Sequence, residues 1–416
     1  MKKTKILEAL LAGALAFALF SCSSPSGGDS GSGSKSGSDK HTDEDQPIKG
    51  SLTVAETWEG KDDSGNELTY YISGTYVVEN GGALTIKEGA IVKLASSGTI
   101  QVKGGGSLIA NGVVFTSYKD SRGRKILAAG DSEPKPADWK NIYIGGGHAE
   151  FYNCEFSYGG NNANTVSVIK AGNSNATCRV DGCLFKYNYG SREVDYDVYS
   201  ALRYEDNVIY GEDNRVTNTT FENNVWPLTV PAYFSVSDTL TFGEGDKANE
   251  YNMIHINSNT IKDQTVVWGH QTVPYIHPAS SNKIDIQSGG TLTIKGGPDA
   301  EHPTVVEFDH NGLVISKGGK LNVEENIHFT NSEKSENNTF KGLYCYADFY
   351  VARYNDPTKI DHHIGQVWLQ SNTAKNIIID NDQPTGSDYT TGNYIEDHKK
   401  IIQLSNPDPS WLVGKE

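Results

Sequence analysis

Two aspartates and an arginine in the stretch SREVDYDVYSALRYEDN (191–207) have the spacing that best suits catalysis. Asp195 and Asp197 alternate with Tyr196, so on a β-strand both carboxylates would face one side and could share a cation such as Ca²⁺. Arg203 could then act as a base on a substrate held by that cation. The competing interpretation is a solvated acidic loop. We therefore expect no resident cofactor, and Ca²⁺ only if this pair binds it.

Tyrosines are concentrated around the same stretch. A tyrosine combines an apolar ring face with a hydroxyl group, which suits both stacking on sugars and contacts with proteins. In an alternative interpretation, these rings only cover the flank of the folded domain. The candidate binding residues are Tyr187, Tyr189, Tyr196, Tyr199, Tyr204 and Tyr210.

The first residues, MKKTKILEALLAGALAFALFSC, join three lysines to an apolar run that is too short to span a bilayer. This pattern is typical of an export signal. Leu19, Ser21 and Cys22 resemble a bacterial lipobox, although Phe20 departs from the usual small residue. We expect residues 1–21 to be a lipoprotein signal peptide, and Cys22 to carry acyl chains such as palmitate. The alternative is an ordinary secretory peptide in which Cys22 has no role.

Residues 22–47 continue with a Gly/Ser tract that contains acidic residues. Such a composition cannot bury enough apolar surface to fold, so we expect a disordered linker with a reach of about 25–30 Å. Several acyl chains on one cysteine give a stable membrane anchor. The sequence thus predicts a lipid-anchored protein of the bacterial cell envelope, at the outer membrane or cell surface.

The charge of the chain limits its partners. The formal net charge is −16, and removal of the signal peptide, with three lysines and one glutamate, makes it −18. A body this acidic repels phosphate backbones, which argues against nucleic acid. A glycan or a host or envelope protein remains as an expected partner.

Four cysteines follow Cys22, and their spacing does not suit a metal site. They form no CxxC pair and have no histidine at zinc-ligand spacing, so we expect no structural metal. Their disulfide state stays open at this point. The four residues are Cys154, Cys178, Cys183 and Cys345.

One block of the sequence occurs twice. GGALTIKEG (81–89) returns as GGTLTIKGG (289–297), and the matching block extends in both directions to about sixty residues in all. It includes Trp58 with Trp268, residues 69–87 with 274–295, and 113–117 with 327–331. A catalytic motif is rarely duplicated in a single-site enzyme, whereas stacking units must repeat. We therefore expect two modules, 48–264 and 265–416, the second with a C-terminal cap.

A phenylalanine recurs after short alternating strands at intervals that vary, in the order Phe115, Phe156, Phe185 and Phe221. Asn188 and Asn224 follow their phenylalanines by three residues, and Cys154 and Cys183 precede theirs by two. A β-helix suits this pattern, because its turns vary in length while like residues stack about 4.8 Å apart along the axis. A β-propeller would need a regular period, and a sandwich does not favour Gly-Gly-terminated repeats. The expected fold class is all-β.

The order of motifs also carries a family resemblance. Trp58, then GGALTIKEGAIVKL, GGGSLIANGVVFTS and ADWKNIYIGGGHAEFYNCEFSYGG resemble the right-handed parallel β-helix proteins of bacterial surfaces, within the pectin-lyase-like superfold. The resemblance covers roughly residues 50–335, and it implies a right-handed parallel β-helix, or solenoid. Its matching residues are ladder and turn positions, so it implies little about activity.

Enzymes of this superfold would use paired carboxylates, or Ca²⁺ with an arginine or lysine base acting on a uronate. The hydrolase signatures of the family are absent from this sequence, and the acidic body disfavours a uronate. We therefore expect a non-catalytic scaffold, adhesin or glycan-binding module. The alternative is a polysaccharide lyase or glycoside hydrolase on the same fold.

Overall fold

The computed structural model is built almost wholly of β-strands joined by turns. Residues 1–46, which include Cys22 and the expected signal peptide and linker, lie outside the described residues. The structure describes residues 47–126, 132–161, 167–193, 197–277, 284–299, 301–308, 313–315, 319–324, 326–331, 343–345, 366–369 and 377–379.

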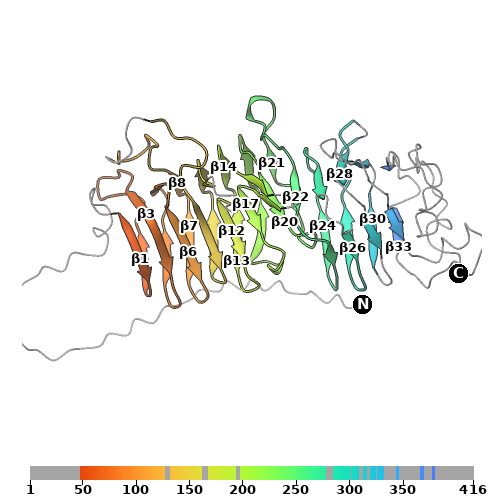
Figure 1. The fold of residues 1–416 in the computed structure, drawn as a ribbon, viewed down its shortest axis with the longest axis horizontal. Coiled ribbons are helices and arrows are strands. Elements are labelled where there is room, and N and C mark those ends of the chain that lie inside the picture. The colour runs from red at the N-terminus through yellow and green to blue at the C-terminus, as the bar shows by residue number, and fades with distance from the viewer. Residues whose placement is uncertain are drawn as a thin grey trace, which may run out of the picture. The chain divides into compact units, whose positions relative to one another are not determined.

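The strands follow one another in a row from β1 to β33 (Figure 1), and neighbouring coils of the chain pair in parallel. Three rows of strands make up the N-terminal part. The first sheet contains β2 (Ala55–Trp58), β4 (Ala83–Ile86), β7 (Ser107–Asn111), β10 (His148–Tyr152), β13 (Thr177–Asp181) and β18 (Asn214–Thr217). The second row contains β5 (Ile91–Leu94), β8 (Val114–Ser117), β11 (Glu155–Ser157), β14 (Leu184–Lys186), β19 (Thr220–Glu222) and β21 (Thr241–Phe242).

The third row runs further along the chain than the other two. It contains β6 (Thr99–Lys103), β9 (Asn141–Gly145), β12 (Ile169–Gly172), β17 (Leu202–Tyr204), β20 (Leu228–Val230), β22 (Ile254–Ile256), β25 (Tyr275–His277), β28 (Thr304–Phe308), β31 (Ile327–Asn331) and β34 (Ile377–Ile379). The long strand β3 (Thr69–Val78) pairs with β1 (Ile48–Leu52), β5 and β6, and so joins the second and third rows into one 18-stranded sheet.

Two further sheets and two small elements complete the described fold. One sheet holds β23 (Thr260–Ile261), β26 (Ile284–Ile286), β29 (Leu313–Ile315) and β32 (Leu343–Cys345). The other holds β24 (Thr265–Trp268), β27 (Thr291–Ile294), β30 (Lys320–Val323) and β33 (Gln366–Leu369). β15 (Ser191–Glu193) and β16 (Asp197–Tyr199) form an antiparallel hairpin, and η3 (Gly245–Lys247) is a short 3₁₀ helix. The prediction of an all-β parallel solenoid is confirmed.

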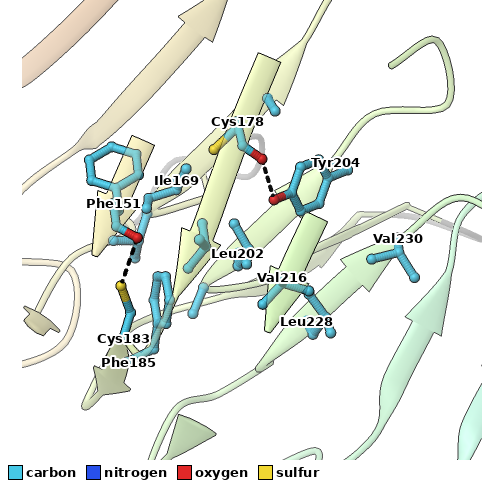
Figure 2. Packing of buried hydrophobic residues seen from close by; sticks show 14 of the residues in the cluster. Phe151, Ile169, Cys178, Cys183, Phe185, Leu202, Tyr204, Val216, Leu228 and Val230 are labelled. Carbon is cyan, nitrogen blue, oxygen red and sulfur yellow. Dashed lines mark hydrogen bonds between the residues drawn. The ribbon is translucent and has the colours of Figure 1, made fainter. Parts of the chain in front are cut away.

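The interior is filled by columns of like side chains. Phe115, Phe156, Phe185 and Phe221 stack with ring centroids 4.7 to 5.1 Å apart, as the recurring phenylalanines predicted. The column continues to Phe242, 5.4 Å from Phe221. Side chains from all three rows point into this core (Figure 2). Each buried phenylalanine contributes several kcal/mol, about 3–5 if truncated to alanine.

Asparagine and cysteine form columns beside the phenylalanines. Asn188 Nδ2 donates to Asn224 Oδ1 at 2.9 Å, and Asn224 Nδ2 donates to Asn249 Oδ1 at 2.9 Å. The Cys154 N–H lies 3.4 Å from the Cys183 sulfur, so these thiols stack as free, buried groups. Asn249 is a third member of this asparagine ladder, of which the sequence pattern indicated only Asn188 and Asn224.

The two copies of the duplicated block fold alike. The Trp58 ring stacks on Tyr70 with centroids 4.7 Å apart, and the Trp268 ring stacks on Tyr275 at 5.1 Å. β4 pairs with β7 after the first stack, and β27 pairs with β30 after the second. The repeated sequence therefore encodes a repeated packing unit.

Sheet membership changes between the two copies. The second row ends at β21. β23, which comes later in the chain, begins a separate four-stranded sheet with β26, β29 and β32. The third row passes through this region without a break, because β22 pairs with β20 on one side and β25 on the other. The division into modules 48–264 and 265–416 stays a prediction.

Candidate functional site

Of the three residues with catalytic spacing, only Arg203 has a described side chain. Asp195 lies outside the described residues, and of Asp197 only the backbone, at the start of β16, is described. The structure thus gives no geometry for a shared cation site, and the pairing of these two carboxylates stays a prediction.

Arg203 is enclosed between β17 and the β15–β16 hairpin, with 3% of the residue exposed. Its Nη1 donates to the Val198 carbonyl at 2.5 Å, and its Nη2 donates to Glu205 Oε2 at 2.9 Å. The guanidinium carbon lies 4.4 Å from the Tyr199 ring centroid. Burial would raise the pKa of Glu205, but Arg203 and Lys170 outweigh it and lower that pKa. These contacts fasten the hairpin to the sheet, and a role of Arg203 as a base stays a prediction.

The tyrosines of the same stretch lie on different parts of the fold. Tyr204 is fully buried, and its hydroxyl donates to the Cys178 carbonyl at 2.8 Å (Figure 2). Tyr199, the last residue of the hairpin strand β16, is 6% exposed, while Tyr210 is half-buried against Phe234.

The remaining tyrosines do not join them in one surface. Tyr187 is 41% exposed and stacks on Tyr158 with centroids 5.7 Å apart. Tyr189 is half-buried, and Tyr196 lies outside the described residues. Of the five described tyrosines, two are buried, two are half-buried and Tyr187 is exposed, and their role in binding stays a prediction.

A cluster of charged residues contacts the connection formed by residues 118–126 and fixes it to the sheet. Lys93 is fully buried, and its Nζ donates to the carbonyls of Asp120 and Arg124, each at 2.7 Å. Arg122 pairs with Asp120 and with Glu155, each at 2.7 Å. Because every one of these charges meets a partner inside the fold, the cluster fastens this connection to the second row.

The outward side chains of β10, β13 and β18 form an open polar surface, which we call the β13 face. They alternate with buried inward residues such as Phe151 and Val180. Strand pairing places them in straight rows across the sheet. The β13 face consists of His148, Glu150, Tyr152, Thr177, Arg179, Asp181, Arg215 and Thr217.

At the centre of the β13 face, an aromatic ring lies beside a fixed ion pair. The Arg179 guanidinium carbon lies 5.3 Å from the Tyr152 ring centroid, and its Nη2 is 4.0 Å from Asp181 Oδ2. Thr217 Oγ1 and Asn218 Nδ2 donate to Asp181 Oδ1 at 2.9 and 2.8 Å. The carboxylate is therefore oriented before any ligand arrives, which lowers the entropy cost of binding.

Hydrogen-bonding groups with defined roles surround this centre. His148 Nδ1 lies 2.7 Å from Thr177 Oγ1, and its Nε2 lies 3.4 Å from Glu150 Oε1. Burial, and then the charge of Glu150, raise the pKa of Tyr152, so its phenol stays protonated at neutral pH and can donate. The surface offers donors, acceptors and a half-buried aromatic ring with a guanidinium over it, groups that a hydroxylated ligand can use.

Sequence reasoning missed the β13 face, although a signal was available. The segments HAEFY (148–152) and TCRVD (177–181) each alternate polar and apolar residues, and both sit one coil apart in the repeat. Period-2 alternation assigns their polar members to the outer surface. What remained hidden was the register that brings Arg179 over Tyr152.

Comparisons with protein-family models, with curated proteins and with solved structures find no match for this chain. In the described part of the chain, no helix has the length and apolar character needed to cross a bilayer. Nor do three or more His, Cys, Asp or Glu side chains of the described residues gather as metal ligands would.

Proposed function

We propose that this chain is a lipid-anchored envelope protein of the surface β-helix type that it resembles, and that it binds a glycan on the β13 face without catalysis. The observation that carries the proposal is the contact of Arg179 with Tyr152 next to Asp181, whose carboxylate is already oriented by two hydrogen bonds. Aromatic rings stack on the apolar faces of sugars, and oriented carboxylates and guanidinium groups bind their hydroxyls.

The solenoid supports this use of the β13 face. A flat parallel sheet holds its outward side chains at fixed intervals, about 4.8 Å between neighbouring strands. The strands are fixed by the stacked core below them, so the surface is rigid and needs little ordering on binding. Such a surface suits an elongated ligand that lies across several strands.

The anchor part of the proposal rests on the sequence. Cys22 follows an apolar run and precedes a Gly/Ser linker, the order expected for a lipidated cysteine and its tether. A tether of this kind would hold the solenoid away from the bilayer, in reach of glycans or of a protein in the envelope or on a host cell.

The proposal is tested with a non-lipidated full chain, C22A, on a glycan array. We expect binding to a defined set of glycans, lost in Y152A and R179A. K247A, which removes a lysine that pairs with Glu222 on the second row, away from the β13 face, serves as the control and should bind normally. Circular dichroism establishes that each variant is folded.

Two results would contradict the proposal. Binding that survives both Y152A and R179A would place the ligand elsewhere, and absence of binding to every glycan would remove the glycan as ligand. Release of shortened or unsaturated products from a polysaccharide by the C22A chain would show that the protein is a lyase or hydrolase instead.

A further inference from the structure

The first sheet is interrupted where the two halves of the solenoid meet. β18 is the last strand of that sheet, and the segment one coil later, residues 235–238, does not pair with it. Val236 instead bridges to Trp268 in β24: its N–H donates to the Val267 carbonyl and its carbonyl accepts from Gly269, both at 2.8 Å. The coils therefore separate on this face while they stay paired on the third row.

Backbone N–H and carbonyl groups of the flanking segments lie on both sides of the interruption. The Thr217 carbonyl points toward β13 and accepts a hydrogen bond from the Gly182 N–H at 3.1 Å. Successive residues of a strand point their backbone groups in opposite directions, so those of Val216 face the interruption. Val236 directs its N–H and carbonyl to β24, and Ser235 and Ser237 on either side of it line the pocket described next. The Ser237 carbonyl accepts from Gln271 Nε2 at 2.6 Å.

A pocket of about 380 Å³ occupies this place. Its size falls in the range of small-ligand sites, and it corresponds to roughly a dozen water volumes, enough for one hexopyranose together with several waters. The side chains that line it and that matter here belong to Tyr210, Arg215, Thr217, Ser237, Asp238 and Lys295.

The charges of the pocket favour a neutral ligand. Arg215 pairs with Glu212 at 2.8 Å, and Lys295 pairs with Glu324 at 2.5 Å, so each cation has an acidic side chain beside it, and Asp238 adds a further negative charge to the lining. The exposed Asp238 carboxylate accepts no hydrogen bond from the described residues and is available to a ligand hydroxyl. A ligand with several hydroxyl groups, which both donate and accept hydrogen bonds, can bind the backbone groups and the Asp238 carboxylate at the same time.

We infer that this pocket binds one neutral pyranose unit of the glycan. The inference rests on the proposed function and deepens it, because Arg215 and Thr217 belong to both the β13 face and the pocket. A glycan chain lying across the β13 face would place one sugar in the pocket, with Tyr210 beside its ring and Asp238 at its hydroxyls.

The test is an NMR titration of the C22A chain with the neutral methyl glycosides of glucose, galactose and mannose. We expect one of them to bind, D238A to weaken that binding about tenfold or more, and S237W to abolish it by filling the pocket. D246A removes an exposed aspartate from η3 and should leave the affinity unchanged.

The outcomes separate this inference from the proposed function. If no methyl glycoside binds, or if binding ignores both D238A and S237W, the pocket inference is wrong. The glycan-binding proposal survives that result as long as array binding still depends on Arg179. Tighter binding of a methyl glucuronoside than of every neutral glycoside would also overturn the inference, because the pocket would then select an anion.

Discussion

Arg179 and Arg215 lie directly beside each other on the β13 face, in register across the parallel strands β13 and β18. Like charges that face each other across neighbouring strands destabilise a sheet. The partner of Arg215, Glu212, is 86% exposed, so this ion pair offsets little of the repulsion. Because the chain has more acidic than basic residues, residue types other than arginine were available at these two positions. A local loss of stability of this kind is typical of functional surfaces.

Replacing Arg215 with glutamine should therefore stabilise the protein and weaken its glycan binding. R215Q is expected to raise the free energy of unfolding by about 0.5 kcal/mol at low salt, with a smaller gain at high salt because ions screen the repulsion. Urea denaturation at two salt concentrations measures this effect. A lower stability of R215Q at low salt would mean that the two guanidinium groups do not repel.

The asparagine ladder should be essential to the stability of the solenoid. Asn224 Nδ2 donates to the Phe185 carbonyl and to Asn249, and its Oδ1 accepts from the side chain and backbone of Asn188. N224A leaves these buried groups unpaired and should cost roughly 3 kcal/mol or more in urea denaturation.

An exposed asparagine provides the matched control for the ladder. Asn111 lies on the outer surface of β7 and accepts one hydrogen bond of 3.3 Å from Asn153. N111A should change the free energy of unfolding by less than about 0.5 kcal/mol. Equal costs for N111A and N224A would show that the ladder contributes nothing specific.

Asp120 should make the protein sensitive to acid. Burial would raise the pKa of Asp120, but hydrogen bonds from Arg122 and Thr116 outweigh it and lower that pKa from 3.8 to about 2. The charged carboxylate thus contributes stability that is present above about pH 4 and is lost as the pH falls toward 2, on the order of 2 kcal/mol.

The D120N variant tests this dependence. It should be less stable than the wild type at pH 7, and the difference in melting temperature between the two should shrink as the pH falls from 4 to 2. D246N, on the exposed helix η3, is the control. If the difference between wild type and D120N stayed constant over that range, the ion pair with Arg122 would not be the cause.

The anchor prediction concerns Cys22, which lies outside the described residues. In the host, the wild-type chain should sediment with membranes after a salt wash, and C22A should appear in the aqueous fraction, because two or more acyl chains are the expected attachment. Metabolic labelling with a palmitate analogue checks the modification directly. C22A that remains with the washed membranes would contradict the lipoprotein interpretation.

The sequence was sufficient to predict the fold because its signals are local and repeated. A phenylalanine recurs within each of four short strands, and stacking in a solenoid requires only that such strands return, not that they return at equal spacing. Phe242 was missed because its strand has only two residues, too few to show an alternating pattern.

The site was harder to predict because it depends on register. Tyr204 occurs in a tyrosine-rich stretch, yet it belongs to the strand Leu202–Tyr204 and points into the core. The contact of Arg179 with Tyr152 joins residues 27 positions apart in neighbouring coils, and the connection between the coils sets which side chains meet. The pocket beside β18 depends on an interruption of pairing that leaves no mark in composition.

The most direct test of the central claim is hydrogen–deuterium exchange of the C22A chain with and without the glycan found on the array. Binding on the β13 face should slow exchange in peptides that cover residues 148–152, 177–181 and 214–217, and leave residues 141–145 and 169–172 of the third row unchanged. Slower exchange confined to the third row and the β15–β16 hairpin, with the β13 face unaffected, would contradict the account.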